Sequence, residues 1–368
     1  MGFFTISYIF FIYIYLVYYI FFFKEFFKII MAKAKLELEE EVAKFDSRDT
    51  LSKFLNENEE DHLNFIKSRT YRVSTGSLMW DFYLNGGLTP GLSRFTGPPE
   101  SGKTSAMFEI ARNFLALGKN RKVVYIKAEG RLSEEMQLRC GLPFVTKAED
   151  WCDGSIFVFK TNIFESVIGL IQKLLEENEA ETYFCFIIDS MDGLILRDDY
   201  KKTFEENVKV AGTPLLTKRF FQKLGARISE LGHMVLMTTQ YSSNIEIQYT
   251  AATEKRSKQG GGGWALAHFA NYAFDFSETH NAGLIKEIKD QPISINNRQL
   301  GKIVKVKFTK SPNEQSNMIV EYPVKNGVIG GSSVWKTYEI FDILTKFKLI
   351  NSKGAWSYLS DESQFDEM

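Results

Sequence analysis

Residues 97–104 constrain what this chain can fold into more than any other stretch. They read Gly-Pro-Pro-Glu-Ser-Gly-Lys-Thr and fit the phosphate-binding loop pattern G-x-x-x-x-G-K-[ST] at every fixed position. A loop of this kind needs a strand before it and a helix after it. Ser93–Thr96 can form a short strand, and Ser105–Leu117 has the apolar periodicity of a helix. The sequence therefore predicts a strand–loop–helix unit.

The residue types in this loop suit a nucleoside triphosphate. Glycines let backbone N–H groups turn toward an anion, and the start of the helix adds further N–H groups. Lys103 would neutralise the β- and γ-phosphates, and the Thr104 hydroxyl would ligate Mg²⁺. The predicted ATP-binding residues are Gly97, Pro98, Pro99, Glu100, Ser101, Gly102, Lys103, Thr104 and Ser105. A chance match in a surface turn is the alternative, which the fitting flanks disfavour.

The composition is ordinary for a globular protein in a reducing compartment. The chain of 368 residues has room for one large domain with appendages or for two domains. Its net charge is −1, so a polyanion would have to be held by a local patch of positive charge. The three cysteines, Cys140, Cys152 and Cys185, show no C-x-x-C spacing, which argues against a disulfide framework or a zinc site.

Residues 3–23 carry no charge and are crowded with Phe, Tyr and Ile. Their length suffices for a membrane span, and the lysines from Lys24 onward would then hold the rest of the chain on the cytoplasmic side. A secretory signal is disfavoured, because the basic segment and the small-residue cleavage site are missing. The alternative, which we favour, is that residues 1–30 are a hydrophobic extension translated from AT-rich sequence before Met31. We expect no membrane partner unless residues 3–23 are a real span.

After this extension the pattern changes twice. Residues 31–69 are polar and predict a small helical N-terminal element, and residues 331–368 predict a short C-terminal region with an acidic tail. Between them, residues 70–330 alternate apolar strand patterns with amphipathic helix patterns. The strands are expected at 122–126, 156–159, 183–189 and 234–239, and the helices at 164–175 and 213–231. This alternation predicts an α/β fold with a mainly parallel twisted sheet and flanking helices.

Polar residues end several of these strands, where ligands of parallel sheets bind. Asp189 ends the most apolar strand and would hold Mg²⁺ together with Thr104. Glu129 ends the strand after the phosphate-loop helix and would polarise an attacking water. Gln240 follows a later strand and would sense the γ-phosphate through its amide. A helix-capping aspartate and a surface glutamate are the alternatives for Asp189 and Glu129.

Six ordered motifs resemble the RecA-type recombinases, in both bacterial and phage members. The match runs from about Tyr71 to Tyr358. The motifs lie at 74–78 with 87–88, at 97–104, at 128–129, at 187–190, at 262–266 and at 354–358. The last two are similar to the G-G-x-A-L that closes the second DNA-binding loop and to G-A-W-Y-S-Y. These two separate this family from other ATPases with a RecA-like phosphate-loop core.

The resemblance implies ATP-dependent homologous recombination. A DNA-dependent ATPase would form a helical filament on single-stranded DNA and exchange strands with double-stranded DNA, with ATP and Mg²⁺ bound between subunits. It implies a cytoplasmic protein, in a host cytoplasm if a phage encodes it. The implied catalytic residues are Glu129, Lys103, Gln240 and Lys310.

This chain departs from the family pattern at three places. Lys310 matches the second of two lysines that reach the neighbouring subunit's nucleotide, and Phe308 stands at the place of the first. Met136 stands where bacterial members usually place a tyrosine against adenine. The chain ends soon after Tyr358, so the C-terminal region is expected to be truncated. Phage members of the family vary more in this region, and this chain looks closer to them.

Two stretches after core strands are candidate DNA-binding loops. The first, roughly residues 197–212, contains Arg197, Lys201 and Lys202. The second, roughly residues 242–263, contains Lys255, Arg256, Lys258, Gly262 and Gly263. The basic side chains would bind phosphates with an affinity that falls with salt, and nothing suggests base-specific contacts. Ordinary solvated loops are the alternative on composition alone.

Two other functions stay open at the level of sequence. A ring-forming helicase with a RecA-like fold would appear as hexameric rings rather than filaments. A recombination mediator or filament scaffold would bind ATP without useful hydrolysis, which the changes at Phe308 and Met136 would suit. Hydrolysis of ATP with and without single-stranded DNA separates both from a recombinase.

Overall fold

The computed structural model describes residues 21–35, 47–129, 132–178, 182–203, 212–243, 258–260, 268–278, 281–353 and 356–359. The chain divides into two compact units, Met1–Phe65 and Ile66–Met368. In the first unit, residues 21–35 are helical, α2 spans Ser47–Glu57 and the 3₁₀ turn η1 spans Glu59–Asp61. The predicted N-terminal element is therefore helical in part.

Within the described residues, no helix is both long enough and apolar enough to cross a membrane. Residues 3–20 of the predicted hydrophobic span lie outside that part of the chain.

The second unit is built on one ten-stranded sheet with the order β10-β11-β9-β1-β6-β5-β2-β4-β3, and β12 pairs with β11. The seven strands from β9 to β3 in this order run parallel, whereas β10, β11 and β12 add antiparallel pairs at one side. The bounds are β1 (Gly91–Thr96), β2 (Arg121–Lys127), β3 (Phe144–Val145), β4 (Ile156–Lys160), β5 (Tyr183–Asp189), β6 (Met234–Thr239), β9 (Tyr272–Phe276), β10 (Leu284–Lys286), β11 (Gln299–Lys310) and β12 (Ile319–Lys325). The predicted mainly parallel sheet is confirmed.

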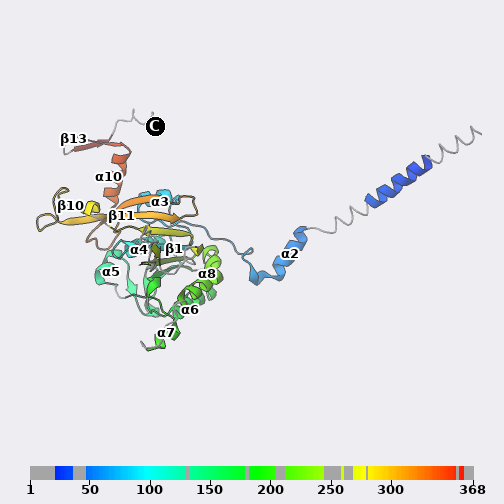
Figure 1. Ribbon diagram of the computed structural model, residues 1–368, viewed down its shortest axis with the longest axis horizontal. Helices are drawn as coiled ribbons and strands as arrows, with labels where there is room; N and C mark the ends of the chain where they lie inside the picture. The colour runs from blue at the N-terminus through cyan, green and yellow to red at the C-terminus, as the bar shows by residue number, and fades with distance from the viewer. Residues whose placement is uncertain are drawn as a thin grey trace, which may run out of the picture. The chain divides into compact units, whose positions relative to one another are not determined.

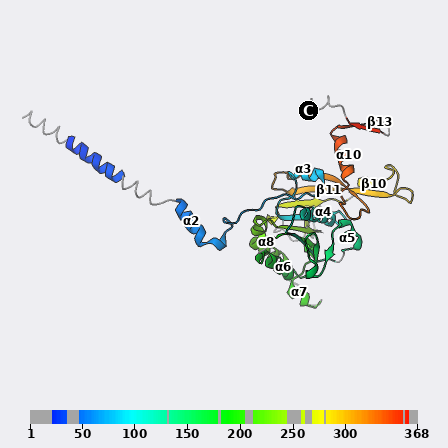
Figure 2. The ribbon, with the colours of Figure 1, turned by 180° about the vertical axis from the view of Figure 1, so that it is seen from behind.

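Helices cover both faces of this sheet, as Figures 1 and 2 show. One core lies under α4 (Lys103–Ala116) and α5 (Glu134–Cys140), and a second lies under α6 (Phe164–Glu176) and α8 (Gly212–Glu230). The central strands send alternate side chains into the two cores, which explains why their sequences are continuously apolar.

Shorter elements complete this unit. They are α3 (Leu78–Tyr83), η2 (Ala148–Asp150), η3 (Met191–Gly193), α7 (Arg197–Lys201), η4 (Asn281–Gly283), α10 (Lys336–Lys346), the paired strands β7 (Tyr241–Ser243) and β8 (Lys258–Gly260), and the hairpin β13 (Ile350–Lys353) with β14 (Trp356–Leu359). β7 and β8 are antiparallel and stand at the base of the second candidate DNA-binding loop. Much of that loop lies outside the described residues.

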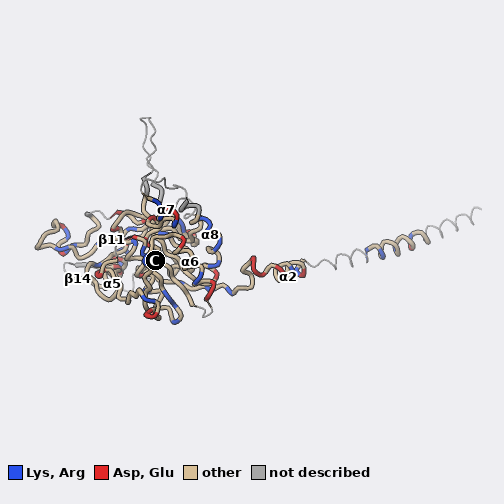
Figure 3. The backbone as a smooth tube through the Cα atoms, turned by 90° about the horizontal axis from the view of Figure 1, so that it is seen from below, with Lys and Arg blue, Asp and Glu red and all other residues tan. Residues whose placement is uncertain are grey.

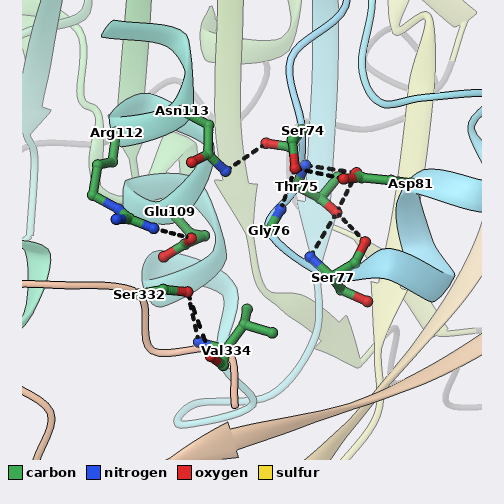
Figure 4. Close-up of polar contacts among 10 residues, drawn as sticks. All are labelled: Ser74, Thr75, Gly76, Ser77, Asp81, Glu109, Arg112, Asn113, Ser332 and Val334. Carbon is green, nitrogen blue, oxygen red and sulfur yellow. Dashed lines mark hydrogen bonds and ion pairs between the residues drawn. The ribbon is translucent and has the colours of Figure 1, made fainter. Parts of the chain in front are cut away.

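A compact polar turn precedes α3 (Figure 4). The Asp81 carboxylate accepts hydrogen bonds from the Thr75 backbone N–H and hydroxyl, both at 2.7 Å, and from the Ser74 hydroxyl at 2.5 Å. The Asn113 amide on α4 donates to the Ser74 carbonyl oxygen at 2.9 Å. These bonds fasten the segment before β1 to the helix that follows the phosphate loop.

The side chain of Glu339, on α10, caps the start of α3 from the far end of the sequence. This carboxylate is 2% exposed and accepts hydrogen bonds from the Ser77 hydroxyl at 2.5 Å, the Leu78 N–H at 3.1 Å and the Met79 N–H at 3.2 Å. The first N–H groups of a helix lack partners within the helix, so a carboxylate there is stabilising. The C-terminal region is thus tied into the fold of the second unit.

Candidate functional site

The phosphate loop leaves β1 and enters α4 at the carboxyl end of the parallel strands. Gly97 and Gly102 have φ values of 151° and 104°, which suit glycine, and a Cβ on Gly97 would lie 2.5 Å from the Phe276 carbonyl oxygen. The Lys103 ammonium donates to the carbonyl oxygens of Gly97 at 2.7 Å and Pro98 at 2.6 Å. Burial lowers the pKa of Lys103, while the charge of Asp189 opposes that change.

Asp189 is held at the end of β5 by three hydroxyl groups. Its Oδ2 accepts hydrogen bonds from the Thr104 hydroxyl at 2.9 Å and the Tyr125 hydroxyl at 3.2 Å, and its Oδ1 accepts one from the Thr238 hydroxyl at 2.7 Å. The phosphate loop, β2 and β6 thus all orient one carboxylate. The predicted partnership of Thr104 and Asp189 is present in the geometry.

These two oxygen donors fit Mg²⁺, which prefers oxygen ligands and commonly binds through one or two carboxylates and substrate phosphates. Among the described residues, no group of three or more His, Cys, Asp or Glu side chains could hold a metal ion. A metal at Thr104 and Asp189 would therefore depend on phosphate oxygens for the rest of its coordination.

Glu129 lies beside Asp189, and each of the two Glu129 carboxylate oxygens has a polar partner. Oε1 accepts from the Ser190 hydroxyl at 2.5 Å, and Oε2 is 3.5 Å from the Gln240 amide nitrogen. Gly193 leaves the space for this arrangement, since a Cβ there would lie 2.5 Å from Glu129 Cγ. The structure therefore brings Glu129 and Gln240 together, next to the Thr104–Asp189 pair.

Lys310 lies in a different place. It is the last residue of β11, which runs antiparallel to β9, and its ammonium donates to the His268 carbonyl oxygen at 2.7 Å. Its partner in the sheet is Ala273, near the amino end of β9, whereas the phosphate loop follows the carboxyl end of β1. Lys310 thus lies toward the amino ends of the parallel strands, whereas its own phosphate loop lies at their carboxyl ends.

Phe308 is a core residue. It is 0% exposed, and its ring lies 5.1 Å from that of Phe274 in an edge-to-face arrangement. This side chain therefore points into the core. Whether a neighbouring subunit loses a contact because Phe308 stands at the place of the first lysine stays a prediction.

The residues predicted to bind DNA are only partly within the described chain. Arg197 donates to the Ser166 hydroxyl at 3.0 Å, Lys202 pairs with Asp199 at 2.6 Å, and Lys201 is exposed at the end of α7. Lys255, Arg256, Gly262 and Gly263 lie outside the described residues, and Lys258 begins β8. Figure 3 shows further Lys and Arg along α8.

A cleft opens beside the first turn of α4. Its lining includes Ser105, Met136, Arg139, Cys140 and Ser333. Met136, which was predicted to lie against a base, is therefore next to the last residue of the predicted ATP-binding segment. Burial raises the pKa of the Cys140 thiol to about 12, so this cysteine stays protonated at neutral pH.

Sequence reasoning missed several residues of the site. Ser190 directly follows Asp189, and its place after a strand-ending aspartate was the one local indication of its contact with Glu129. Tyr125 and Thr238 lie inside apolar strands, where nothing in the sequence distinguishes them from ordinary core positions. Their role follows only from the strand order, which places β2 and β6 on either side of β5.

Comparison with known proteins agrees with this arrangement. A model of the Rad51 family matches residues 66–304. The RecA protein of Bartonella bacilliformis is 25% identical over 288 residues, covering 77% of this chain and 72% of that protein. The RecA protein of Synechocystis sp. is 23% identical over 297 residues, covering 80% and 74%, and that of Agrobacterium fabrum is 24% identical over 286 residues, covering 77% and 69%. Because the family match covers more than half of the sequence, this chain belongs to the Rad51 family and is a RecA-type recombinase.

Proposed function

We propose that this protein is a DNA-dependent ATPase that forms helical filaments on single-stranded DNA and exchanges its strand with double-stranded DNA. The observation that supports this proposal is that five predicted residues lie together at the carboxyl ends of the parallel strands. Lys103 and Thr104 come from the phosphate loop, Asp189 and Glu129 end neighbouring strands, and Gln240 follows the next strand. Each supplies a different part of the chemistry of phosphoryl transfer.

The residues divide the work as follows. Lys103 and the backbone N–H groups of the loop would bind the phosphates, and Thr104 with Asp189 would hold Mg²⁺. When bound, Mg²⁺ would offset the negative charge that develops on the phosphate oxygens. Glu129 would accept the proton of the attacking water. Ser190 and Gln240 orient the two oxygens of Glu129 for that task.

The base of ATP would enter the cleft at Met136. Ser105, where the phosphate loop continues into α4, lines the same cleft, so the base of a nucleotide held by this loop would lie near Met136. A thioether gives a soft apolar contact to an aromatic ring without the plane of a tyrosine. We therefore propose a base contact with less stacking than a tyrosine would provide.

A second subunit completes the proposed site. Lys310 faces away from its own phosphate loop, so it would act on the nucleotide of a neighbouring copy. The interface would then be heterologous, and repeated copies would build a helical filament. DNA would bind through the two loops, with Lys201 exposed in the first and Lys255, Arg256, Lys258, Gly262 and Gly263 in the second.

ATP hydrolysis measured with and without single-stranded DNA, over a series of salt concentrations, tests this function. We expect hydrolysis to require Mg²⁺, to rise with DNA and to lose that stimulation as salt increases. Lys103→Ala should lower kcat/KM about 100-fold, the usual effect of removing one charge-stabilising group. Glu129→Gln should retain ATP binding and DNA binding but lower kcat about 100-fold or more.

Lys119→Ala, at an exposed position after α4, is the matched control for Lys103→Ala. A wild-type protein that ignores single-stranded DNA at low salt would contradict the proposed function. Normal hydrolysis by Glu129→Gln would contradict only the role of Glu129.

A further inference from the structure

A buried arginine lies on the strand next to β6, and the two residues after β6, Gln240 and Tyr241, connect the nucleotide site to the second candidate DNA-binding loop. Arg94 is in the middle of β1, between β6 and β9, and is 8% exposed. Its Nε donates to the Thr239 hydroxyl at 3.1 Å, and that hydroxyl lies 2.9 Å from the Thr96 hydroxyl. An uncompensated charge inside a sheet is strongly destabilising, so negative charges are expected near Arg94.

Two carboxylates compensate this charge. Burial lowers the pKa of Arg94, and the negative charges of Asp275 and Asp192 oppose that change. Asp275 lies on β9, next to β1, whereas Asp192 lies at the exposed rim, in the turn after β5. Burial also raises the pKa of Asp275, and the hydrogen bond from Tyr241 and the charge of Arg94 counteract this.

Each carboxylate also holds one of two consecutive residues at the exit of β6. Asp192 accepts a hydrogen bond from the backbone N–H of Gln240 at 2.5 Å. Asp275 accepts one from the Tyr241 hydroxyl, whose pKa is raised to about 12 by burial and by the charge of Asp275. The chain is therefore fixed at the point where it leaves the sheet.

Gln240 and Tyr241 face two different parts of the molecule. The Gln240 side chain reaches Glu129, with its amide nitrogen 3.5 Å from Oε2. Tyr241 begins β7 and pairs with Gly260 of β8, so it starts the two-stranded arm at the base of the loop. A displacement of this arm would pull on Tyr241 and, one residue earlier, on the amide that contacts the proposed base.

We propose that Arg94, Asp192 and Asp275 are positioning residues that couple DNA binding at the β7–β8 arm to the carboxylate of Glu129. The cluster holds the backbone of Gln240 and the hydroxyl of Tyr241. A movement of the β7–β8 arm would therefore shift the Gln240 amide that contacts Glu129. This inference rests on the proposed DNA-dependent ATPase. It adds Arg94, Asp192 and Asp275 to the residues that the sequence singled out for this site.

The test uses the full-length protein with Asp192→Ala, Asp192→Asn and Tyr241→Phe. ATP hydrolysis is measured over a range of ATP concentrations, with and without single-stranded DNA. In Asp192→Ala we expect KM for ATP to stay within about twofold and the stimulation of kcat by DNA to fall about tenfold, a typical coupling between sites. Asp192→Asn should recover most of the stimulation, because its amide oxygen can still accept the Gln240 N–H.

Tyr241→Phe removes only the hydroxyl that bonds Asp275, and it should also reduce the stimulation. If Asp192→Ala fails to fold, the result for Tyr241→Phe alone tests the proposed coupling. Asp153→Ala, at an exposed turn, is the surface control and should behave as wild type. Wild-type stimulation in both Asp192→Ala and Tyr241→Phe would overturn the coupling role. Absence of stimulation in the wild-type protein would instead overturn the proposed function.

Discussion

His233 is a fully buried imidazole at the amino end of β6. Its Nδ1 lies 3.1 Å from the Phe184 backbone N–H and accepts that hydrogen bond, so the ring proton is on Nε2. Within the described residues, Nε2 has no hydrogen-bond partner. Burial, with a smaller effect from the charge of Arg69, lowers the pKa of His233 to about 4. Protonation would put a second N–H in place of the acceptor that Phe184 uses.

This histidine should make the protein sensitive to mild acid. The folded-state pKa is below the ordinary value, so the unfolded chain binds the proton more readily, and the protein loses stability as pH falls from about 6.5 toward 4. We expect His233 to lower the free energy of unfolding by about 2 kcal/mol between pH 8 and pH 5. Urea denaturation at both pH values measures this. His233→Asn keeps an acceptor but cannot titrate there, so an equal loss in that variant would refute the assignment.

At the residue scale, the positions of site residues were predictable where a motif fixes both residue type and spacing, and their roles stay predictions. Lys103, Thr104 and Asp189 lie together as the phosphate-loop pattern and the apolar strand suggested. Arg94 and Asp192 could not be found in that way, because their relation depends on β1 and β5 both adjoining β6. Arg94 is an arginine in a buried strand, and Asp192 is an aspartate in a turn. Neither sequence setting indicates a particular role.

At the scale of elements, α3 depends on a carboxylate from another helix. Ser77 caps this six-residue helix by accepting the Trp80 N–H at 3.2 Å, and Glu339 on α10 accepts from the Ser77 hydroxyl and from the next two N–H groups. A helix this short is marginal by itself, so tertiary contacts supply its stability. Trp80 anchors the same helix in the core, with its ring 5.0 Å from that of Phe274.

Glu339→Ala should therefore destabilise the protein by about 3 kcal/mol, because it leaves buried N–H and hydroxyl donors without an acceptor. The measurement is the midpoint of urea denaturation followed by circular dichroism. Asp342→Ala, on the same helix, removes only an exposed ion pair with Lys346 and should cost less than about 0.5 kcal/mol. Equal effects of the two substitutions would show that the capping contacts contribute little.

The strands and helices of the parallel core were predictable because each is long and apolar in a single pattern. The positions of β2, β4, β5, β6, α6 and α8 agree with the periodicity, with ends that differ by at most one residue. The antiparallel strands β10, β11 and β12 were not predicted. β11 alternates buried and exposed residues and is rich in lysine, and its pairing with β9 and β12 is not evident from its own sequence.

At the scale of the whole molecule, the proposed site needs two copies of the chain. Lys310 and the phosphate loop lie toward opposite ends of the parallel strands. One copy would therefore supply the loop and another copy the lysine. Fold class and family could be predicted from the order of motifs. The assignment of Lys310 to a neighbour came from the resemblance, and the strand order now gives it a geometric reason.

Mixing two inactive variants tests this arrangement. Lys310→Ala has an intact phosphate loop, and Lys103→Ala has an intact Lys310. If the site is shared, an equal mixture should regain up to about a quarter of wild-type ATP hydrolysis, since random head-to-tail assembly gives that share of complete interfaces. Each variant alone is the control. Full activity of Lys310→Ala alone, or no recovery on mixing, would contradict a shared site.

The bond between Ser77 and Glu339 spans 262 positions of sequence. A ribosome making this chain releases the start of α3 long before it reaches the codon for residue 339. During that interval the nascent helix has only part of its cap, and the sheet beneath it is incomplete because β9, β11 and β12 have not all been translated. The second unit can therefore reach its final structure only when synthesis is nearly complete, and until then part of its apolar surface stays uncovered.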